Sequence, residues 1–446
     1  QTTTDGTVAV GSTALAALTS GAGNVGIGFQ AGENLTTGER NVVLGHQALN
    51  NATTETDDNV AIGYRAMNGA ISTEAVNDCI AIGSLALDGA LEEEVSGTVA
   101  VGASALGALT SGGHNTAIGY NSMLKLTTGA ENVAIGKLSM EEADGGESYN
   151  VAIGYHAMGD VDHDDSDSNV AIGGSALAGG DAAVKNCVAI GYNALDHTAG
   201  NAQDGTVAIG KGALTALTSG GSNTAVGYLA LTAVTANGYN TAVGATALDA
   251  CTGAQNTAVG WDAGGSIIGG DNNVCIGSNS GDVITTGDGN TILGDGADPS
   301  ANDGANQTVI GFNTTGVADN SVTLGNASVT AVHCGQDAAT AGAGARIFAK
   351  KIITRSDDAS DYCGTFENRG DNANRLGISV RAGAYGPSSA GDCKYVSFFD
   401  GDETAAGGIQ NSSTVANPEF FNGSDLRMKK DIATTQMKGL DTINAI

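Results

Sequence analysis

The stretch 115–136, NTAIGYNSMLKLTTGAENVAIG, contains two copies of a short pattern that recurs along most of the chain. A glycine closes each copy, and nineteen copies are spaced by 14 to 20 residues, most often 17. The closing glycines stand at positions 11, 28, 45, 63, 83, 102, 119, 136, 154, 173, 191, 210, 227, 244, 260, 277, 294, 311 and 325. Such a period predicts a solenoid, because each unit can bury its apolar face only against its neighbours.

The three residues before each glycine have the pattern of a short strand. The residue directly before it is Val, Ile or Leu and the residue three before it is Val, Ile or Thr in all nineteen copies, and the residue between them is Ala in thirteen. Side chains alternate along a strand, so this strand is apolar on both faces and should be covered on both. We expect the large residues to fill the inside of the coil. The alanine column would then let another chain approach.

Asparagine stands four residues before the glycine in twelve copies. We expect these side chains to form a ladder at one corner of the coil, each amide bonding to the rungs above and below and to the backbone of the turns. The column comprises Asn24, Asn41, Asn59, Asn115, Asn132, Asn150, Asn169, Asn223, Asn240, Asn256, Asn273 and Asn290.

A second short apolar segment follows each strand, since the third and fourth positions after the glycine usually read Ala-Leu or Ala-Met. The rest of each unit is rich in Gly, Asn, Thr and Ser, which favour turns. The sequence therefore predicts an all-β fold, a parallel β-roll or β-solenoid of about nineteen rungs over residues 1–333. At about 4.8 Å per rung, the rod would be on the order of 90 Å long.

Charge and composition limit the partners. Residues 1–333 carry 34 acidic and 6 basic side chains, which gives a net charge of −28, and the whole chain carries −30. Such a surface repels nucleic acid and anionic membranes, and no apolar stretch is long enough to insert into a bilayer. Seven cysteines without C-x-x-C spacing indicate reduced, buried thiols instead of disulfides or a zinc site. The sequence predicts no cofactor and no metal.

Eight copies place an aromatic residue directly after the glycine. One interpretation is a column on which sugars stack, and the other is a packing position between chains or at a corner. The second interpretation is favoured because the aromatics alternate irregularly with Ser, Lys and Ala. The column comprises Phe29, Tyr64, Tyr120, Tyr155, Tyr192, Tyr228, Trp261 and Phe312.

The NVAIG rungs, together with the closing NSVTLGN at 320–326, resemble the left-handed parallel β-roll repeats of bacteriophage tail fibres and of trimeric autotransporter adhesin heads. The resemblance covers residues 5–333. It implies a homotrimer around a three-fold axis.

The last part of the sequence has a different character. Residues 334–346 predict a linker of small residues, and the period is absent from 347 onward. The runs 347–354, 362–368, 375–382 and 394–400 predict strands of a compact β module over 347–423. Since this module holds more basic residues, it is a candidate for contact with an anionic cell-surface glycan.

The segment SDLRMKKDI at 424–432 resembles the start of the endosialidase-type intramolecular chaperone that ends many phage tailspikes and tail fibres. The resemblance covers 424–446. It implies that, in the full-length product, Ser424 is the nucleophile and Lys429 the base of a single autoproteolytic cleavage at the Gly423–Ser424 bond, after the trimer has folded. A neutral lysine can take the proton of a serine in this way. The alternative is a plain helix start with Ser424 as its N-cap.

An acidic insertion, GDVDHDDSDS, occupies 159–168 and packs five aspartates into ten residues. It lacks the Gly and Glu that an EF-hand loop requires at its sixth and twelfth positions. A solvated, charged insertion is the favoured interpretation, and calcium binding at 160–167 stays open.

The leading functional hypothesis is a structural and adhesive tail fibre located on a virion. Such a fibre would assemble in the host cytoplasm, bind other virion tail proteins and attach to a glycan or protein receptor on the host cell. Two alternatives remain: a tailspike that degrades surface polysaccharide, and a bacterial trimeric adhesin. No substrate-directed enzyme activity is predicted.

Overall fold

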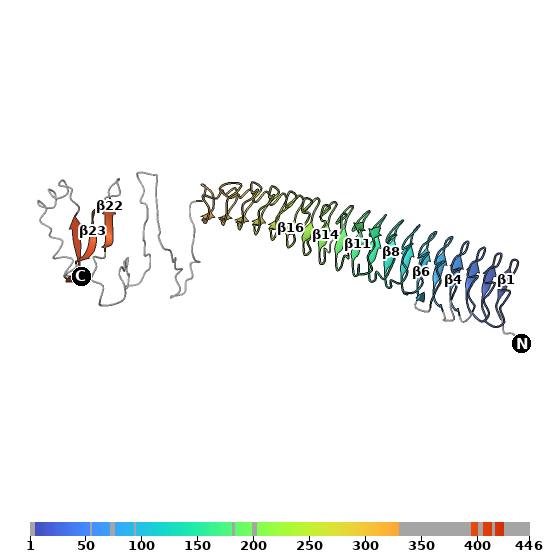
Figure 1. The fold of residues 1–446 in the computed structure, drawn as a ribbon. Coiled ribbons are helices and arrows are strands. Elements are labelled where there is room, and N and C mark those ends of the chain that lie inside the picture. The colour runs from blue at the N-terminus through green and yellow to red at the C-terminus, as the bar shows by residue number, and fades with distance from the viewer. Residues whose placement is uncertain are drawn as a thin grey trace, which may run out of the picture. The chain divides into compact units, whose positions relative to one another are not determined.

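The structure is a computed structural model that describes residues 5–53, 56–71, 76–92, 95–180, 183–198 and 203–329, and the backbone of three strands between 394 and 422. The chain divides into two compact units, Gln1–His333 and Cys334–Ile446. The first unit is the solenoid that the period predicts, and its strands stack in chain order (Figure 1).

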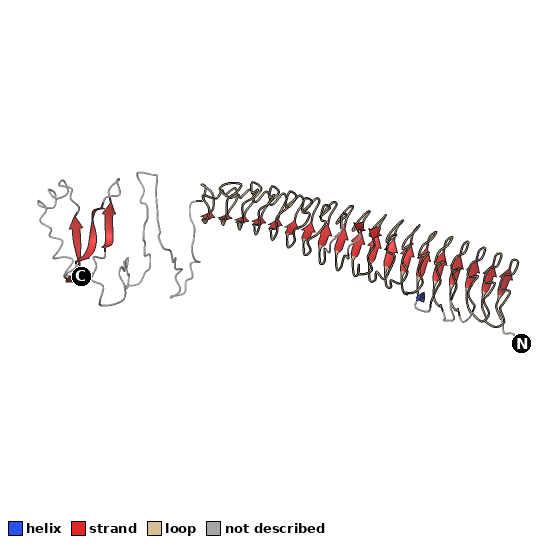
Figure 2. Ribbon diagram, viewed as in Figure 1, coloured by secondary structure: helices blue, strands red, loops and turns tan. Residues whose placement is uncertain are grey.

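Nineteen strands of three residues each form one parallel sheet (Figure 2). Each strand pairs in register with the strands of the rungs before and after it, so Thr116, Ala117 and Ile118 lie beside Val133, Ala134 and Ile135. The strands are β1 (Val8–Val10), β2 (Val25–Ile27), β3 (Val42–Leu44), β4 (Val60–Ile62), β5 (Ile80–Ile82), β6 (Val99–Val101), β7 (Thr116–Ile118), β8 (Val133–Ile135), β9 (Val151–Ile153), β11 (Val170–Ile172), β13 (Val188–Ile190), β14 (Val207–Ile209), β15 (Thr224–Val226), β16 (Thr241–Val243), β17 (Thr257–Val259), β18 (Val274–Ile276), β19 (Thr291–Leu293), β20 (Thr308–Ile310) and β21 (Val322–Leu324). The predicted fold class and the number of rungs are confirmed.

The glycine that ends each strand is required by both conformation and space. Eighteen of the nineteen closing glycines have φ between +133° and +150°, a region that side chains strongly disfavour. A Cβ at Gly136 would also lie 2.2 Å from the carbonyl oxygen of Gly154 in the next rung. The closing glycines therefore let successive rungs approach each other at the point where the chain turns.

The faces of the strand are the reverse of those expected from the sequence. The middle residue points into the coil, and Ala117 and Ala134 are fully buried. The flanking residues point outward, with 39% of Ile118 and 36% of Ile135 exposed. The prediction that the β-branched face fills the interior, and that the alanine column contacts another chain, is wrong.

The reason is that the turn fills the interior instead. The Ala and the Leu or Met at the third and fourth positions after the glycine are buried, as in Ala66-Met67 and Ala157-Met158, where both methionines are fully buried. In most rungs this fourth residue has a left-handed φ near +50°, which turns its side chain inward. A large residue from the turn leaves room only for a small residue on the strand.

The residue at the fourth position after the glycine and the middle residue of the next strand have complementary sizes. In twelve rungs a Leu or Met at the fourth position precedes a strand whose middle residue is Ala. Where the fourth position is Gly32 or Gly281, the next strand carries Val43 or Ile292 in the middle. The contact is direct, since a Cβ on Gly26 would lie 2.7 Å from Cγ of Leu15. Interior volume is thus kept nearly constant along the solenoid.

A second, two-stranded sheet includes the first residues of the acidic insertion. Strand β10 (Asp160–Val161) pairs in parallel with β12 (Gly179–Gly180), outside the main sheet. Val161 is buried, so the insertion is anchored to the solenoid on one side.

In the second unit the described residues form a three-stranded antiparallel sheet of β22 (Lys394–Phe399), β23 (Ala405–Ser412) and β24 (Val415–Asn422). Strand β22 falls on the predicted run 394–400. The linker 334–346 and the other predicted runs of the C-terminal module lie outside the described residues. Across the described part of the chain, no helix has the length and apolar character needed to cross a bilayer.

Candidate functional site

The asparagine column forms a hydrogen-bonded ladder at one corner of the solenoid, with the geometry that the sequence predicts. In one rung the backbone N–H and the side-chain Nδ2 of Asn41 both donate to Oδ1 of Asn24, at 3.0 and 3.1 Å. Nδ2 of Asn41 also donates to the carbonyl oxygen of Thr56, at 2.6 Å. All twelve side chains are fully buried. The ladder therefore satisfies polar groups inside the corner, and its role is structural.

The ladder consists of three runs separated by two breaks. The runs are Asn24 to Asn59, Asn115 to Asn169 and Asn223 to Asn290. At each break, the asparagine position holds a cysteine in one rung and a threonine in the next. These residues are Cys79 and Thr98 at the first break, and Cys187 and Thr206 at the second. The thiols take the place of the amide, since Cys187 Sγ donates to the carbonyl oxygen of Gln203 at 3.1 Å.

The four cysteines among the described residues are buried, free thiols. Burial raises the pKa of Cys79, Cys187 and Cys251 to about 11 and that of Cys275 to about 12. Since the thiolate is the reactive form, these groups are chemically inert at neutral pH. They are packing and corner residues, as the sequence indicates.

The outer face of the nineteen-stranded sheet is largely apolar, with threonine at six of the nineteen positions three before the closing glycine, and it is partly exposed. Its two columns are the residues one and three before each closing glycine. The exposed fraction is 42% at Leu44 and 43% at Leu293, and it is higher on the two end strands, 57% at Val10 and 67% at Val322. A contiguous, largely apolar surface of this kind indicates an interaction surface. We call these two columns the outer apolar face. The sequence does not distinguish this face, because the same pattern is apolar on both sides of the strand.

The aromatic column lies beside this face and is also exposed. Tyr64 is 50% exposed, Tyr155 57% and Trp261 57%, so these rings do not pack into a corner of their own chain. The remaining members, Phe29, Tyr120, Tyr192, Tyr228 and Phe312, are exposed between 46% and 64%. Both stacking on a sugar and contact with another chain are compatible with this exposure.

Cationic and imidazole side chains stand between some of the rings. The ring of His46 lies 5.0 Å from that of Phe29 and 5.5 Å from that of Tyr64. Nζ of Lys137 lies 5.9 Å from the ring centroids of both Tyr120 and Tyr155. These contacts link three successive rungs on the surface, and a cation near an aromatic face is attracted to it.

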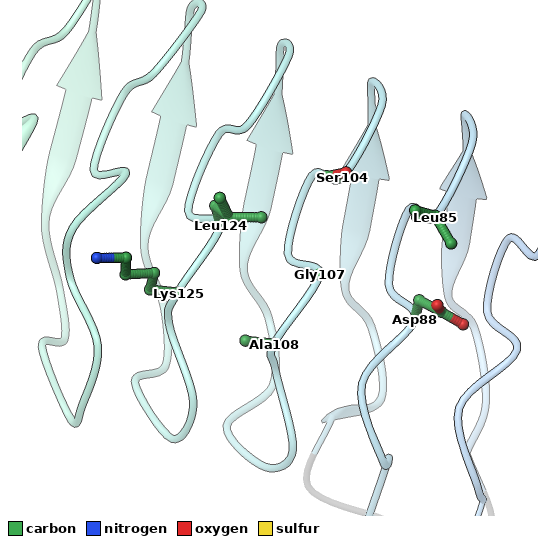
Figure 3. Close-up of a pocket in the computed structure, with 7 residues that line it drawn as sticks. All are labelled: Leu85, Asp88, Ser104, Gly107, Ala108, Leu124 and Lys125. Atoms are coloured by element: carbon green, nitrogen blue, oxygen red, sulfur yellow. The ribbon is translucent and has the colours of Figure 1, made fainter.

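An open hollow of about 350 Å³ spans three turns in the N-terminal half of the solenoid (Figure 3). Leu85, Ser104 and Leu124 line it, with Asp88 at one end and Lys125 at the other. Both charges have partners, because Oδ2 of Asp88 lies 3.5 Å from Nη2 of Arg65 and Lys125 pairs with Glu142. The hollow therefore presents no unpaired charge to a ligand.

The residues of the predicted cleavage site, Gly423, Ser424 and Lys429, lie outside the described residues. Their roles as scissile bond, nucleophile and base stay predictions.

The sequence matches no protein-family model, and no curated protein matches it.

Proposed function

We propose that the solenoid is the shaft of a homotrimeric virion fibre that attaches to a host-cell surface. In this proposal the segment beginning at Ser424 starts a self-cleaving chaperone that acts during trimer assembly. The observation that carries the proposal is the outer apolar face, which runs the length of the solenoid and is uncovered in a single chain.

The chemistry of this face favours a second copy of the chain over a soluble ligand. It consists of branched residues at a regular spacing, so copies of the same solenoid can match it rung by rung. Burying such apolar area stabilises an assembly by about 25 cal/mol per Å². The net charge of −28 is carried by the turns and keeps the other surfaces soluble.

The oligomeric state is tested by a double substitution, Ile118→Lys with Ile135→Lys, on two adjacent rungs of the outer apolar face. We expect native mass spectrometry and light scattering to show trimers for the wild type and a shift toward monomers for the variant. Glu131→Lys is the matched control, since Glu131 is exposed at the corner between the same rungs. A wild-type monomer would refute the trimeric fibre.

Host attachment is tested with fluorescently labelled trimer and host cells. Binding that is lost on enzymatic removal of surface glycan supports a glycan receptor, and binding that survives it supports a protein receptor. Incubation with purified capsule separates the alternatives, because shortened polysaccharide would indicate a degrading tailspike instead of a pure adhesin. A purely bacterial adhesin requires a membrane-anchoring domain in the same gene product.

Maturation is tested in the full-length gene product by denaturing mass spectrometry. We expect the wild-type chain to end at Gly423 and the Ser424→Ala chain to stay intact. A folded trimer of intact wild-type chains would exclude the cleavage, while leaving the role of the shaft unaffected.

A further inference from the structure

We propose that Asp144, Glu147 and Asp162 bind one calcium ion between two adjacent rungs of the solenoid. One oxygen from each of the three carboxylates lies within 4.8 Å of the others. Two ligand oxygens on opposite sides of a Ca²⁺ ion, each at about 2.4 Å, are about 4.8 Å apart, so three such oxygens fit one coordination sphere. This proposal does not depend on the proposed function.

Glu147 is the unusual member of the group. Its side chain is fully buried, and its Oε1 has no hydrogen-bond partner, while Oε2 accepts a hydrogen bond from the backbone N–H of Gly145 at 3.1 Å. A buried carboxylate oxygen without a partner costs free energy unless a cation or a proton compensates it. The two other carboxylates, which are exposed, leave the group open to solvent.

The position of Glu147 in its rung makes an acid unexpected there. Its carbonyl oxygen accepts the ladder hydrogen bond from Nδ2 of Asn132, at 2.7 Å. In other rungs the residue that accepts this bond is uncharged, for example Gly38, Val184 or Gly270. Packing therefore does not explain why this inward corner position holds a carboxylate.

Both segments that supply the carboxylates are held by side-chain hydrogen bonds to their backbone carbonyl oxygens. The carbonyl oxygen of Asp144 accepts from Oγ1 of Thr127 at 2.7 Å, which ties the first segment to the preceding rung. The second segment carries Asp162 directly after β10, and the carbonyl oxygen of Ser166 accepts from Nδ2 of Asn150 at 2.8 Å. The ligands are thus positioned before an ion binds, which lowers the entropic cost of binding.

The surrounding charges raise the attraction for a cation. Asp164 packs against Gly145, where an added Cβ would lie 1.7 Å from Asp164 Oδ1. Lys125 lies on this side, where it pairs with Glu142 and its charge also acts on Asp162 and Asp144, and Nζ of Lys185 lies 3.6 Å from Oδ1 of Asp165. Three carboxylate ligands suit calcium better than magnesium, which demands a near-ideal octahedron, usually keeps several waters and binds through one or two carboxylates.

The test uses the full chain, freed of metal with a chelator and then titrated with CaCl₂ by calorimetry at pH 7.5. We expect one Ca²⁺ per chain and a higher Tm in calcium than in chelator. Glu147→Gln and Asp162→Asn should each weaken binding by at least about tenfold, the lower end of the loss known for groups that merely support a metal ligand. The Tm of Glu147→Gln should no longer respond to calcium.

The matched control is Asp165→Asn, which removes one negative charge from the same insertion at an exposed position. It should bind calcium within about twofold of the wild type, since Asp165 is not part of the group. Equal weakening in all three variants would mean diffuse attraction to an acidic surface and would overturn the site. A wild type without a calcium response, or one that binds Mg²⁺ as tightly, would overturn it as well. Because Asp162 is exposed, Asp162→Asn tests the proposal even if Glu147→Gln fails to fold.

Discussion

Two regions of the solenoid share the same sheet but differ at the corner where the asparagine ladder lies. One is the run from Asn223 to Asn290, and the other is the break at Cys187 and Thr206. In the run, each amide donates to a turn carbonyl and accepts from the next rung, as Asn256 does with Gly270 and Asn273. At the break, the thiol of Cys187 donates a weaker hydrogen bond to the carbonyl oxygen of Gln203, and Oγ1 of Thr206 is buried without a partner.

The strands continue in register through both regions. Val188, Ala189 and Ile190 pair with Val207, Ala208 and Ile209 across the break in the same way as strands pair within the run. The sheet therefore depends on backbone bonds and interior volume, whereas the ladder adds stability at the corner. A solenoid is stabilised mainly by nearest-neighbour contacts, so its breaks are local weak points.

The largest effect should follow from breaking the longest run. Asn256→Ala leaves the carbonyl oxygen of Gly270 and the backbone N–H of Asn273 without their partners. We expect a loss of about 3 to 5 kcal/mol, since each buried group left unsatisfied costs about 1 to 3 kcal/mol. Denaturant unfolding of the full chain, with native-state hydrogen exchange at the neighbouring amides, measures it.

The control for this variant is Thr206→Ala, at the equivalent corner position in the break. Because its hydroxyl has no partner, we expect a change below about 0.5 kcal/mol. Similar losses at both positions would mean that the amide ladder contributes no more than side-chain packing.

A smaller effect should follow from removing the thiol. Cys187→Ala deletes the hydrogen bond from the thiol to the carbonyl oxygen of Gln203. We expect a loss of about 1 to 2 kcal/mol, because a thiol is a weak donor and a weak acceptor. The same unfolding measurement checks it, and a loss as large as that of Asn256→Ala would remove the distinction between run and break.

The period, the strands and the ladder were predictable from sequence because they depend on residue type at a fixed spacing. The orientation of the strand was not, since Val133-Ala134-Ile135 is apolar on both faces. The decisive information lies in the neighbouring rung, where a large residue such as Met123 precedes the small Ala134 and the small Gly32 precedes the large Val43. Reading the two positions together would have placed alanine inside.

The calcium ligands were only partly visible for a similar reason. The acidic insertion drew attention to 159–168, but two of the three carboxylates, Asp144 and Glu147, come from the preceding rung. In a solenoid, residues about one period apart become neighbours. An acid at an inward corner position, as at Glu147, is the signal that sequence analysis could have used.

The smallest predicted effect concerns Asp298, in the turn that follows the last asparagine of the longest run. Where most turns bury a Leu or Met, this turn carries Asp298, whose Oδ1 is buried. Burial, and then the nearby carboxylate of Asp282, raise the pKa of Asp298 to about 6. Since the folded chain holds this proton more tightly than the unfolded one, the stabilisation is present near pH 4 and is lost as the pH rises through about 6.

Asp298→Asn should therefore unfold at higher denaturant than the wild type at pH 7 and similarly to it at pH 4. The gain should be about 1 kcal/mol, less than the full pKa shift implies, because the carboxyl group is partly exposed. Asp319→Asn is the matched control with the opposite sign, since hydrogen bonds from the backbone of Ala305 and from Gln307 lower the pKa of Asp319. That variant should lose stability at pH 7 and recover it relative to the wild type as the pH falls. If both variants responded to pH alike, the net charge of the solenoid, and not the buried corner at Asp298, would govern its pH dependence.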